Sequence, residues 1–180
     1  MRRTLAFALA VAIALLHAGP AAAQTITIMP LARDGQLLVT FTLTDGLDDE
    51  VRAAIHSGMN ITFQYQVDLR RSTTLWLDRT IASAVVSASV RYDTLTRKYH
   101  FSRMHDGRTL LVDSTDSYDV VRQWLTDFDK LPLFNSGALE RNTEYYVRVR
   151  ATKSPRNSSF VWPWAAHDVM GQVKFTFLPR

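Results

Sequence analysis

The chain has 180 residues, contains no cysteine and carries a formal net charge of +4 at pH 7. This length suits one domain, and the lack of cysteine excludes a disulfide framework, a thiolate metal site and a cysteine nucleophile. Arg2 and Arg3 supply two of the four net positive charges, so the rest of the chain carries only +2. A nearly neutral chain gives no electrostatic reason to expect nucleic-acid binding.

The first 23 residues have the three parts of a secretory signal peptide. A positive start is followed by an apolar run from Leu5 to Leu16 and by three alanines at 21–23. The run is shorter than the roughly 20 apolar residues of a transmembrane anchor. We therefore expect a bacterial signal peptide over residues 1–23, a single periplasmic domain over residues 24–180, and no transmembrane anchor after cleavage.

Apolar and polar residues alternate along most of the remaining chain. The alternation covers residues 37–44, 59–69, 84–92, 145–149 and 173–177, and a shorter stretch covers residues 25–31. Alternation of this length is typical of antiparallel strands with one buried face. The Asp106-Gly107 pair predicts a tight hairpin between strands near residues 99–103 and 109–112. The sequence thus predicts a mainly β fold, an antiparallel β-sandwich of the immunoglobulin or fibronectin type III kind.

Two segments depart from the alternation. Residues 44–58 place Leu47, Val51 and Ile55 four apart, begin with acidic residues and end at Gly58, which predicts a short helix.

Residues 114–132 carry Val121, Leu125 and Phe128 on one helical stripe. They predict a second short helix, capped by Ser114 and ending before Pro132. Both helices would lie in connections between strands.

No arrangement of reactive side chains stands out. The sequence has no HExxH, no GxSxG and no cysteine, and nothing selects a pair of carboxylates for sugar hydrolysis. His100 and His105 have opposite parity on one strand and so should point to opposite faces. We therefore predict no catalytic residue, no metal ligand and no cofactor, although a hidden triad stays open.

The candidate contact residues lie near the end of the chain. Arg148 and Arg150 share the predicted outward face of one strand, beside Tyr146, and Trp162 and Trp164 share one side of an extended segment. The arginines would suit an acidic partner, and the aromatic residues would suit a small ligand or glycan. The alternatives are a solvated sheet face and tryptophans that plug one end of the sandwich.

One segment resembles the tyrosine corner of fibronectin type III domains. Leu139, Thr143 and Tyr145 stand where that family has a leucine six residues and a threonine two residues before a tyrosine. The resemblance implies that the Tyr145 hydroxyl is tied to upstream backbone and fixes the crossing between sheets. Arg141 departs from the pattern, which prefers proline there.

A wider resemblance covers nearly all of the chain after residue 23. The run Tyr92 to Tyr99, "YDTLTRKY", together with "FQYQVDLRRSTTLWLDRTIAS" and the segment around Trp124, is similar to a family of proteobacterial envelope proteins known as domain of unknown function 4390. The resemblance implies a secreted single-domain protein and a role in envelope signalling. It implies no activity and no catalytic residues.

These observations lead to three functional hypotheses. The first is a periplasmic, non-enzymatic binding or accessory module, not an enzyme, which contacts a protein partner of the cell envelope through strand edges or the arginine-bearing face. The second is a small-molecule or glycan sensor linked to envelope signalling, with Tyr146, Trp162 and Trp164 as ligand contacts. The third is an unrecognised hydrolase.

Overall fold

The computed structural model describes residues 24–72, 78–155 and 168–178. The proposed signal peptide, Trp162 and Trp164 lie outside the described residues. The described chain is mainly β, and its elements in chain order are β1 (Thr25–Arg33), β2 (Gln36–Thr44), α2 (Asp49–His56), β3 (Ile61–Arg71), β4 (Arg79–Asp93), β5 (Lys98–His105), β6 (Arg108–Thr115), α3 (Tyr118–Thr126), β7 (Asp127–Asn135), the 3-10 turn η1 (Ser136–Ala138), β8 (Thr143–Pro155) and β9 (Val169–Phe177). None of the helices in this described part is both long and apolar enough to cross a membrane.

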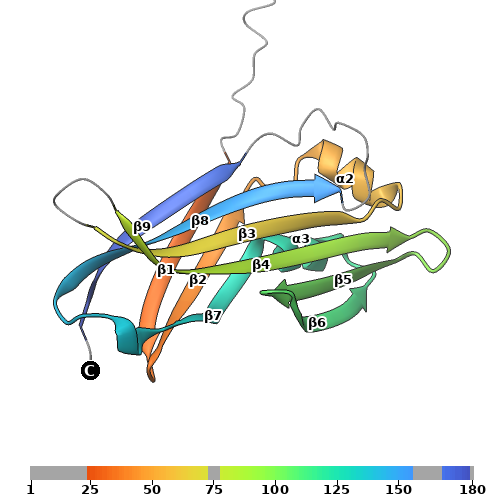
Figure 1. The fold of residues 1–180 in the computed structure, drawn as a ribbon. Coiled ribbons are helices and arrows are strands. Elements are labelled where there is room, and N and C mark those ends of the chain that lie inside the picture. Colours follow the sequence, from red (N-terminus) through yellow and green to blue (C-terminus); the bar gives the residue numbers. More distant parts are fainter. Residues whose placement is uncertain (1–23, 73–77, 156–167, 179–180) are drawn as a thin grey trace, which may run out of the picture.

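The strands form two antiparallel sheets. One sheet has three strands in the order β1-β2-β7, and the other has six in the order β6-β5-β4-β3-β8-β9. Figure 1 shows the three-stranded sheet crossing the long strands β3, β4 and β8, with α2 and α3 near the end of the large sheet that the small one leaves free. The prediction of an antiparallel β-sandwich with two short helices is confirmed. The closer likeness to immunoglobulin or fibronectin type III domains stays a prediction.

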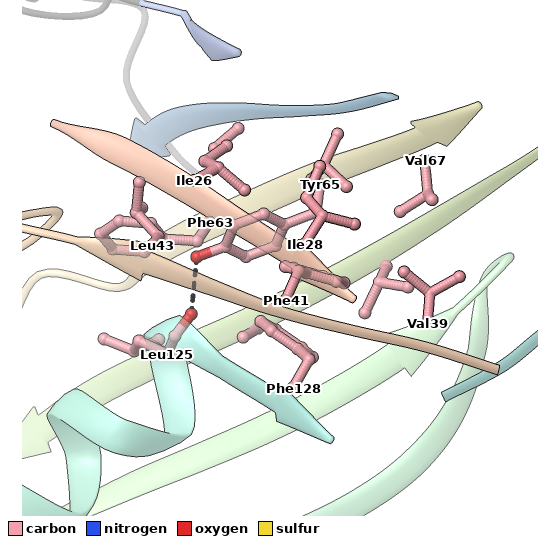
Figure 2. Close-up of a cluster of buried hydrophobic side chains, with 14 of the residues drawn as sticks. Ile26, Ile28, Val39, Phe41, Leu43, Phe63, Tyr65, Val67, Leu125 and Phe128 are labelled. Carbon is pink, nitrogen blue, oxygen red and sulfur yellow. Dashed lines mark hydrogen bonds between the residues drawn. The ribbon is translucent and has the colours of Figure 1, made fainter. Parts of the chain in front are cut away.

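The core lies between the two sheets and follows the alternation of the sequence. Along β2 and β3 every second residue is buried, including Phe41, Phe63 and Tyr65. The rings of Phe41 and Phe128 stack with centroids 4.5 Å apart, and Tyr65 meets the Phe128 ring at 4.9 Å (Figure 2). Large aromatic and branched side chains from both layers thus fill one continuous interior, which stabilises the sandwich by removing apolar surface from water.

The two sheets approach most closely where β1 crosses β9. A Cβ atom added to Gly171 on β9 would lie 2.5 Å from the carbonyl oxygen of Ile26 on β1. Only glycine permits this approach of two backbones. The glycine therefore lets β1, an edge strand of the small sheet, pack directly against a face of β9, an edge strand of the large one.

The first helix is as predicted. Asp48 accepts a hydrogen bond of 2.8 Å from the backbone N–H of Val51 and so caps the N-terminus of α2. Gly58, which follows the helix, has φ +84°. A glycine with this backbone conformation is a common way to end a helix.

The second helix differs from its prediction at both ends. Ser114 lies in β6, and the cap is Ser117, which accepts from the N–H of Val120. The helix ends at Thr126, and Phe128 and Pro132 lie in strand β7. The predicted cap at Ser114 and the extension toward Pro132 were wrong, because apolar residues three and four apart also fit a helix that passes directly into a strand.

Candidate functional site

Arg148, a predicted partner contact, is held within the sheet by an ion pair. Its Nη2 donates to Oδ2 of Asp68 at 2.6 Å, and the exposed fractions of the two side chains are 22% and 6%. Asp68 also accepts from Ser83 Oγ at 2.7 Å and from Gln66 Nε2 at 3.3 Å. Arg148 therefore lies on the face opposite the core, as expected, but much of its charge is compensated by a neighbour in the same sheet.

The same network sets the protonation of Asp68. Burial alone would raise the pKa of this carboxyl, but the hydrogen bonds from Arg148 and Ser83 and the Arg148 charge lower it more. The net result is a pKa below the ordinary value. Asp68 is thus ionised under all near-neutral conditions, and the ion pair with Arg148 persists there.

Tyr146 and Arg150 differ in how accessible they are. Tyr146 is buried, and its hydroxyl donates to Oδ2 of Asp78 at 2.6 Å, while the guanidinium of Arg70 lies 5.5 Å from its ring centroid. Arg150 is half-buried and lies opposite Gln66 on β3 and Met170 on β9. Among the predicted contact residues that the structure describes, Tyr146, Arg148 and Arg150 therefore do not form one open arginine patch.

The predicted corner residues lie together where the chain enters β8. The backbone N–H of Glu140 donates to the hydroxyl of Tyr145 at 2.9 Å, and Tyr145 and Leu139 are both buried. Thr143 Oγ1 donates to the carbonyl of Arg141 at 3.3 Å. This geometry ties a buried tyrosine to upstream backbone across the turn, which is what a tyrosine corner does.

The most open element of the described structure is strand β6. It forms one edge of the six-stranded sheet, and every residue from Arg108 to Ser114 is exposed. Its centre is apolar, with exposed fractions of 52%, 45% and 67% for Leu110, Leu111 and Val112. We call Arg108–Thr115 the β6 edge. In Figure 1 it lies at the rim of the large sheet, beyond β5.

The two edge strands of the small sheet, β1 and β7, carry features that the β6 edge lacks. Strand β1 contains Pro30. Strand β7 carries Pro132 and a left-handed residue, Lys130 with φ +45°. Proline, irregular backbone and covering elements are the usual means of keeping an edge from pairing with another chain. Between its charged ends the β6 edge has a bulge but no proline and no charge.

Sequence reasoning missed one cluster of aromatic and basic side chains at the α2 end. The ring of His56 lies 5.4 Å from Tyr92, 5.8 Å from Tyr99 and 6.0 Å from Tyr118, and Tyr99 Oη is 3.2 Å from His56 Nε2. Burial raises the pKa of Tyr99. Tyr92 and Tyr99 face each other across the β4–β5 pair, which a hairpin prediction implies, but nothing in the sequence signals that the helix brings His56 to them.

A groove of about 840 Å³ opens at the opposite end of the sandwich, where the β1–β2 turn, η1 and the end of β9 meet. Leu31, Leu139 and Phe177 line it, with Arg33 and Arg141 among its polar residues. Arg33 already pairs with Asp34 at 3.1 Å. Within the described residues no group of three His, Asp or Glu side chains is placed to hold a metal ion.

Comparisons with known proteins place the chain by family alone. No curated protein and no solved structure matches it. The model of one family, described as "Domain of unknown function (DUF4390)", matches residues 21–157. Because this match spans most of the chain, the protein belongs to the DUF4390 family.

Proposed function

We propose that this protein is a non-enzymatic binding module of the bacterial cell envelope, which takes up an extended segment of another envelope protein as an added strand on the β6 edge. The observation that carries the proposal is the exposure of β6 from Arg108 to Ser114, with an apolar centre and without a strand on its outer side in the described structure. The envelope location is supported by the signal-peptide pattern of residues 1–23.

The chemistry of strand addition fits this edge. Alternate residues of an edge strand direct backbone N–H and C=O groups away from the sheet, and an incoming segment can satisfy them. Leu111 pairs with Arg103 on the α3-facing side of the sheet, while Val112 pairs with Ser102 on the other side. Apolar side chains of a partner could therefore contact both faces. The partner segment is expected to be extended and uncharged at its centre.

The arginine-bearing face contributes less to this proposal than the edge does. Arg148 is already paired with Asp68, and Lys174 on β9 pairs with Glu144 at 2.9 Å. Ion pairs within the sheet reduce the net field that a partner would sense. We therefore expect partner capture to survive high salt, because main-chain hydrogen bonds and apolar contact depend little on ionic strength.

The test is site-specific crosslinking in native envelopes. A photoreactive residue replaces Val112 in one variant and Leu95 in a control; Leu95 is 92% exposed but lies in the β4–β5 turn, away from any edge. We expect position 112 to crosslink one envelope protein at low and high salt, through a contiguous extended segment of that protein. Val112→Lys should abolish the capture, and Leu95→Lys should not.

Equal crosslinking at both positions, or capture that Val112→Lys leaves unchanged, would contradict strand addition.

The small-molecule sensor remains the second candidate, and the groove beside Arg141 is the observation that favours it. A groove of this size suits a small amphiphilic ligand with an anionic group.

A further inference from the structure

The β6 edge has a bulge that changes which of its side chains share a face. Arg103 of β5 pairs with Leu111, but its neighbour Met104 pairs with Thr109, so Leu110 is an extra residue. Arg108 pairs with His105, and Asp113 pairs with Phe101. His105 and Phe101 have the same parity on β5, so Arg108 and Asp113 lie on the same face although they are five residues apart.

This placement makes the edge complementary to itself. When a strand pairs antiparallel with its own copy about a two-fold axis, facing residues must lie on the same side of the joined sheet. An axis between Leu110 and Leu111 satisfies this rule for the four residues that flank the bulge. Arg108 then faces Asp113 of the second copy, and Thr109 faces Val112. The bulged Leu110 comes opposite Leu111 of the second copy at the centre. The two-fold axis repeats each contact, so two Arg–Asp pairs flank an apolar centre.

We propose that the β6 edge pairs with the β6 edge of a second copy of this chain in the register that joins Arg108 to Asp113, and that this dimer occupies the edge until a partner strand displaces it. The inference rests on the proposed function, since it assigns a resting state to the same edge.

Charge complementarity selects the second copy and the register. In the described structure Arg108 takes part in no ion pair, and Asp113 accepts only from the neighbouring N–H of Ser114 at 2.7 Å. An axis through Leu111 would instead set Arg108 against Ser114, which lies on the other face. Opposite charges that face each other across neighbouring strands stabilise the pairing, and like charges destabilise it.

A short strand pair alone buries less surface than a permanent dimer needs. The dimer is therefore expected to be weak and to depend on protein concentration, which is what a displaceable resting state requires.

The test is a charge exchange followed by light scattering and sedimentation over a range of concentrations. Arg108→Asp and Asp113→Arg each place two pairs of like charges at the interface and should raise the dimer dissociation constant by about tenfold or more. The double variant restores both pairs with reversed polarity and should recover the dimer. Arg141→Asp, an exposed change at the far end of the sandwich, should have no effect.

A chain that stays monomeric at all concentrations overturns the inference, and so does a dimer that neither single variant weakens. A double variant that fails to recover the dimer overturns the register. Circular dichroism of each variant establishes that it is folded. Crosslinking from position 112 to an envelope protein is a separate measurement. If the crosslink forms but no dimer is found, the resting state alone is rejected. If the dimer forms but no envelope protein is crosslinked, the proposed function alone is rejected.

Discussion

Asp68 shows how one residue can depart from the pattern of its strand. Alternation places it on the outward face of β3, yet its side chain is nearly inaccessible, since Arg148, Ser83 and Gln66 all donate to it. A buried carboxylate is tolerated only when its hydrogen bonds are satisfied in this way. The residue therefore stabilises the pairing of three neighbouring strands rather than offering a free charge.

Replacing Asp68 by Asn should lower the free energy of unfolding by about 2 kcal/mol at pH 7, because the charged hydrogen bonds to Arg148 and Ser83 are weakened. The folded-state pKa of Asp68 is lowered, so its contribution to stability is complete above the ordinary carboxyl pKa of about 4 and is lost as the pH falls through the lower folded value. Urea unfolding from pH 7 into the acid range should show the wild type and Asp68→Asn converging.

The control is Asp119→Asn, since Asp119 is exposed on α3 and its partner Arg122 lies 3.6 Å away. A surface pair of this kind contributes little, so this variant should follow the wild type throughout. A constant difference between wild type and Asp68→Asn at every pH would contradict the role assigned to the carboxylate.

At this scale the sequence is informative only where partners are close in the chain. The tie between Tyr145 and Glu140 spans five residues, and the corner motif indicates it. The ion pair between Asp68 and Arg148 spans eighty residues, and parity alone shows only that both face outward. The exposure of Arg148 could therefore not be predicted, because it depends on which strand becomes the neighbour of β8.

At the scale of elements, two side chains, one from β3 and one from β5, hold the C-terminal end of helix α3. Tyr65 Oη donates to the carbonyl of Leu125 at 2.7 Å (Figure 2), and Arg103 donates to the carbonyls of Trp124 and Asp127. Helix-end carbonyls need such partners when they are buried. Burial lowers the pKa of Arg103 to about 10 and raises that of Tyr65, so both groups remain donors at neutral pH.

Arg103→Lys should loosen α3 without unfolding the sandwich. Lysine keeps the charge but loses the planar group that lies 4.1 Å from the ring centroids of Trp124 and Phe128 and reaches two carbonyls. Hydrogen exchange of the α3 amides should become about tenfold faster, which corresponds to about 1.4 kcal/mol. The α2 amides serve as the internal reference.

Arg122→Lys, an exposed change on α3 itself, is the matched control and should leave exchange unaltered. Uniform acceleration over α2 and α3 would mean that Arg103 supports the whole fold rather than the end of one helix.

Most strands could be predicted from their alternation, but β7 could not. Leu125 and Phe128 are three residues apart and fit a helical stripe, yet Leu125 lies in the last turn of α3 and Phe128 is the first buried residue of β7. Pro132 also argues against a central strand, and β7 accommodates it because β7 is an edge. The transition from helix to strand depends on the packing of Phe128 against Tyr65 and Phe41. These residues are distant in the sequence, so the local pattern of apolar residues cannot predict the transition.

At the scale of the whole molecule, Gly171 controls how the two sheets meet. Gly171→Ala should lower the free energy of unfolding by about 1–3 kcal/mol, because the added methyl group meets the carbonyl oxygen of Ile26 and the sheets must shift apart. Gly171→Val should cost more. Chemical denaturation of the series measures both effects.

Truncation of Ile26 tests the cause of that loss. Ile26→Gly removes the Cβ that lies 2.9 Å from the added atom but keeps the carbonyl oxygen at 2.5 Å. Because the nearest atom is the carbonyl oxygen, a double-mutant cycle of Ile26→Gly and Gly171→Ala should give additive losses of stability. A Gly171→Ala loss that becomes smaller in the Ile26→Gly background would show that the conflict lies with the Ile26 side chain.

The two-layer architecture follows from alternation, but the order of strands does not. Nothing in residues 143–155 indicates that β8 inserts beside β3 rather than beside β7, which precedes it directly in the chain. The long, uninterrupted register from Ile61 with Pro155 to Arg71 with Tyr145 is a property of the assembled sheet.

That register has a consequence for the newly made chain. Strand β3 can pair with β4 soon after both are synthesised, but its other edge stays open until β8 has been made, more than eighty residues later. At usual rates of translation this is a delay on the order of ten seconds. For that time the chain exposes one full edge of β3, and its solubility depends on what shields that edge of Ile61–Arg71 until β8 is made.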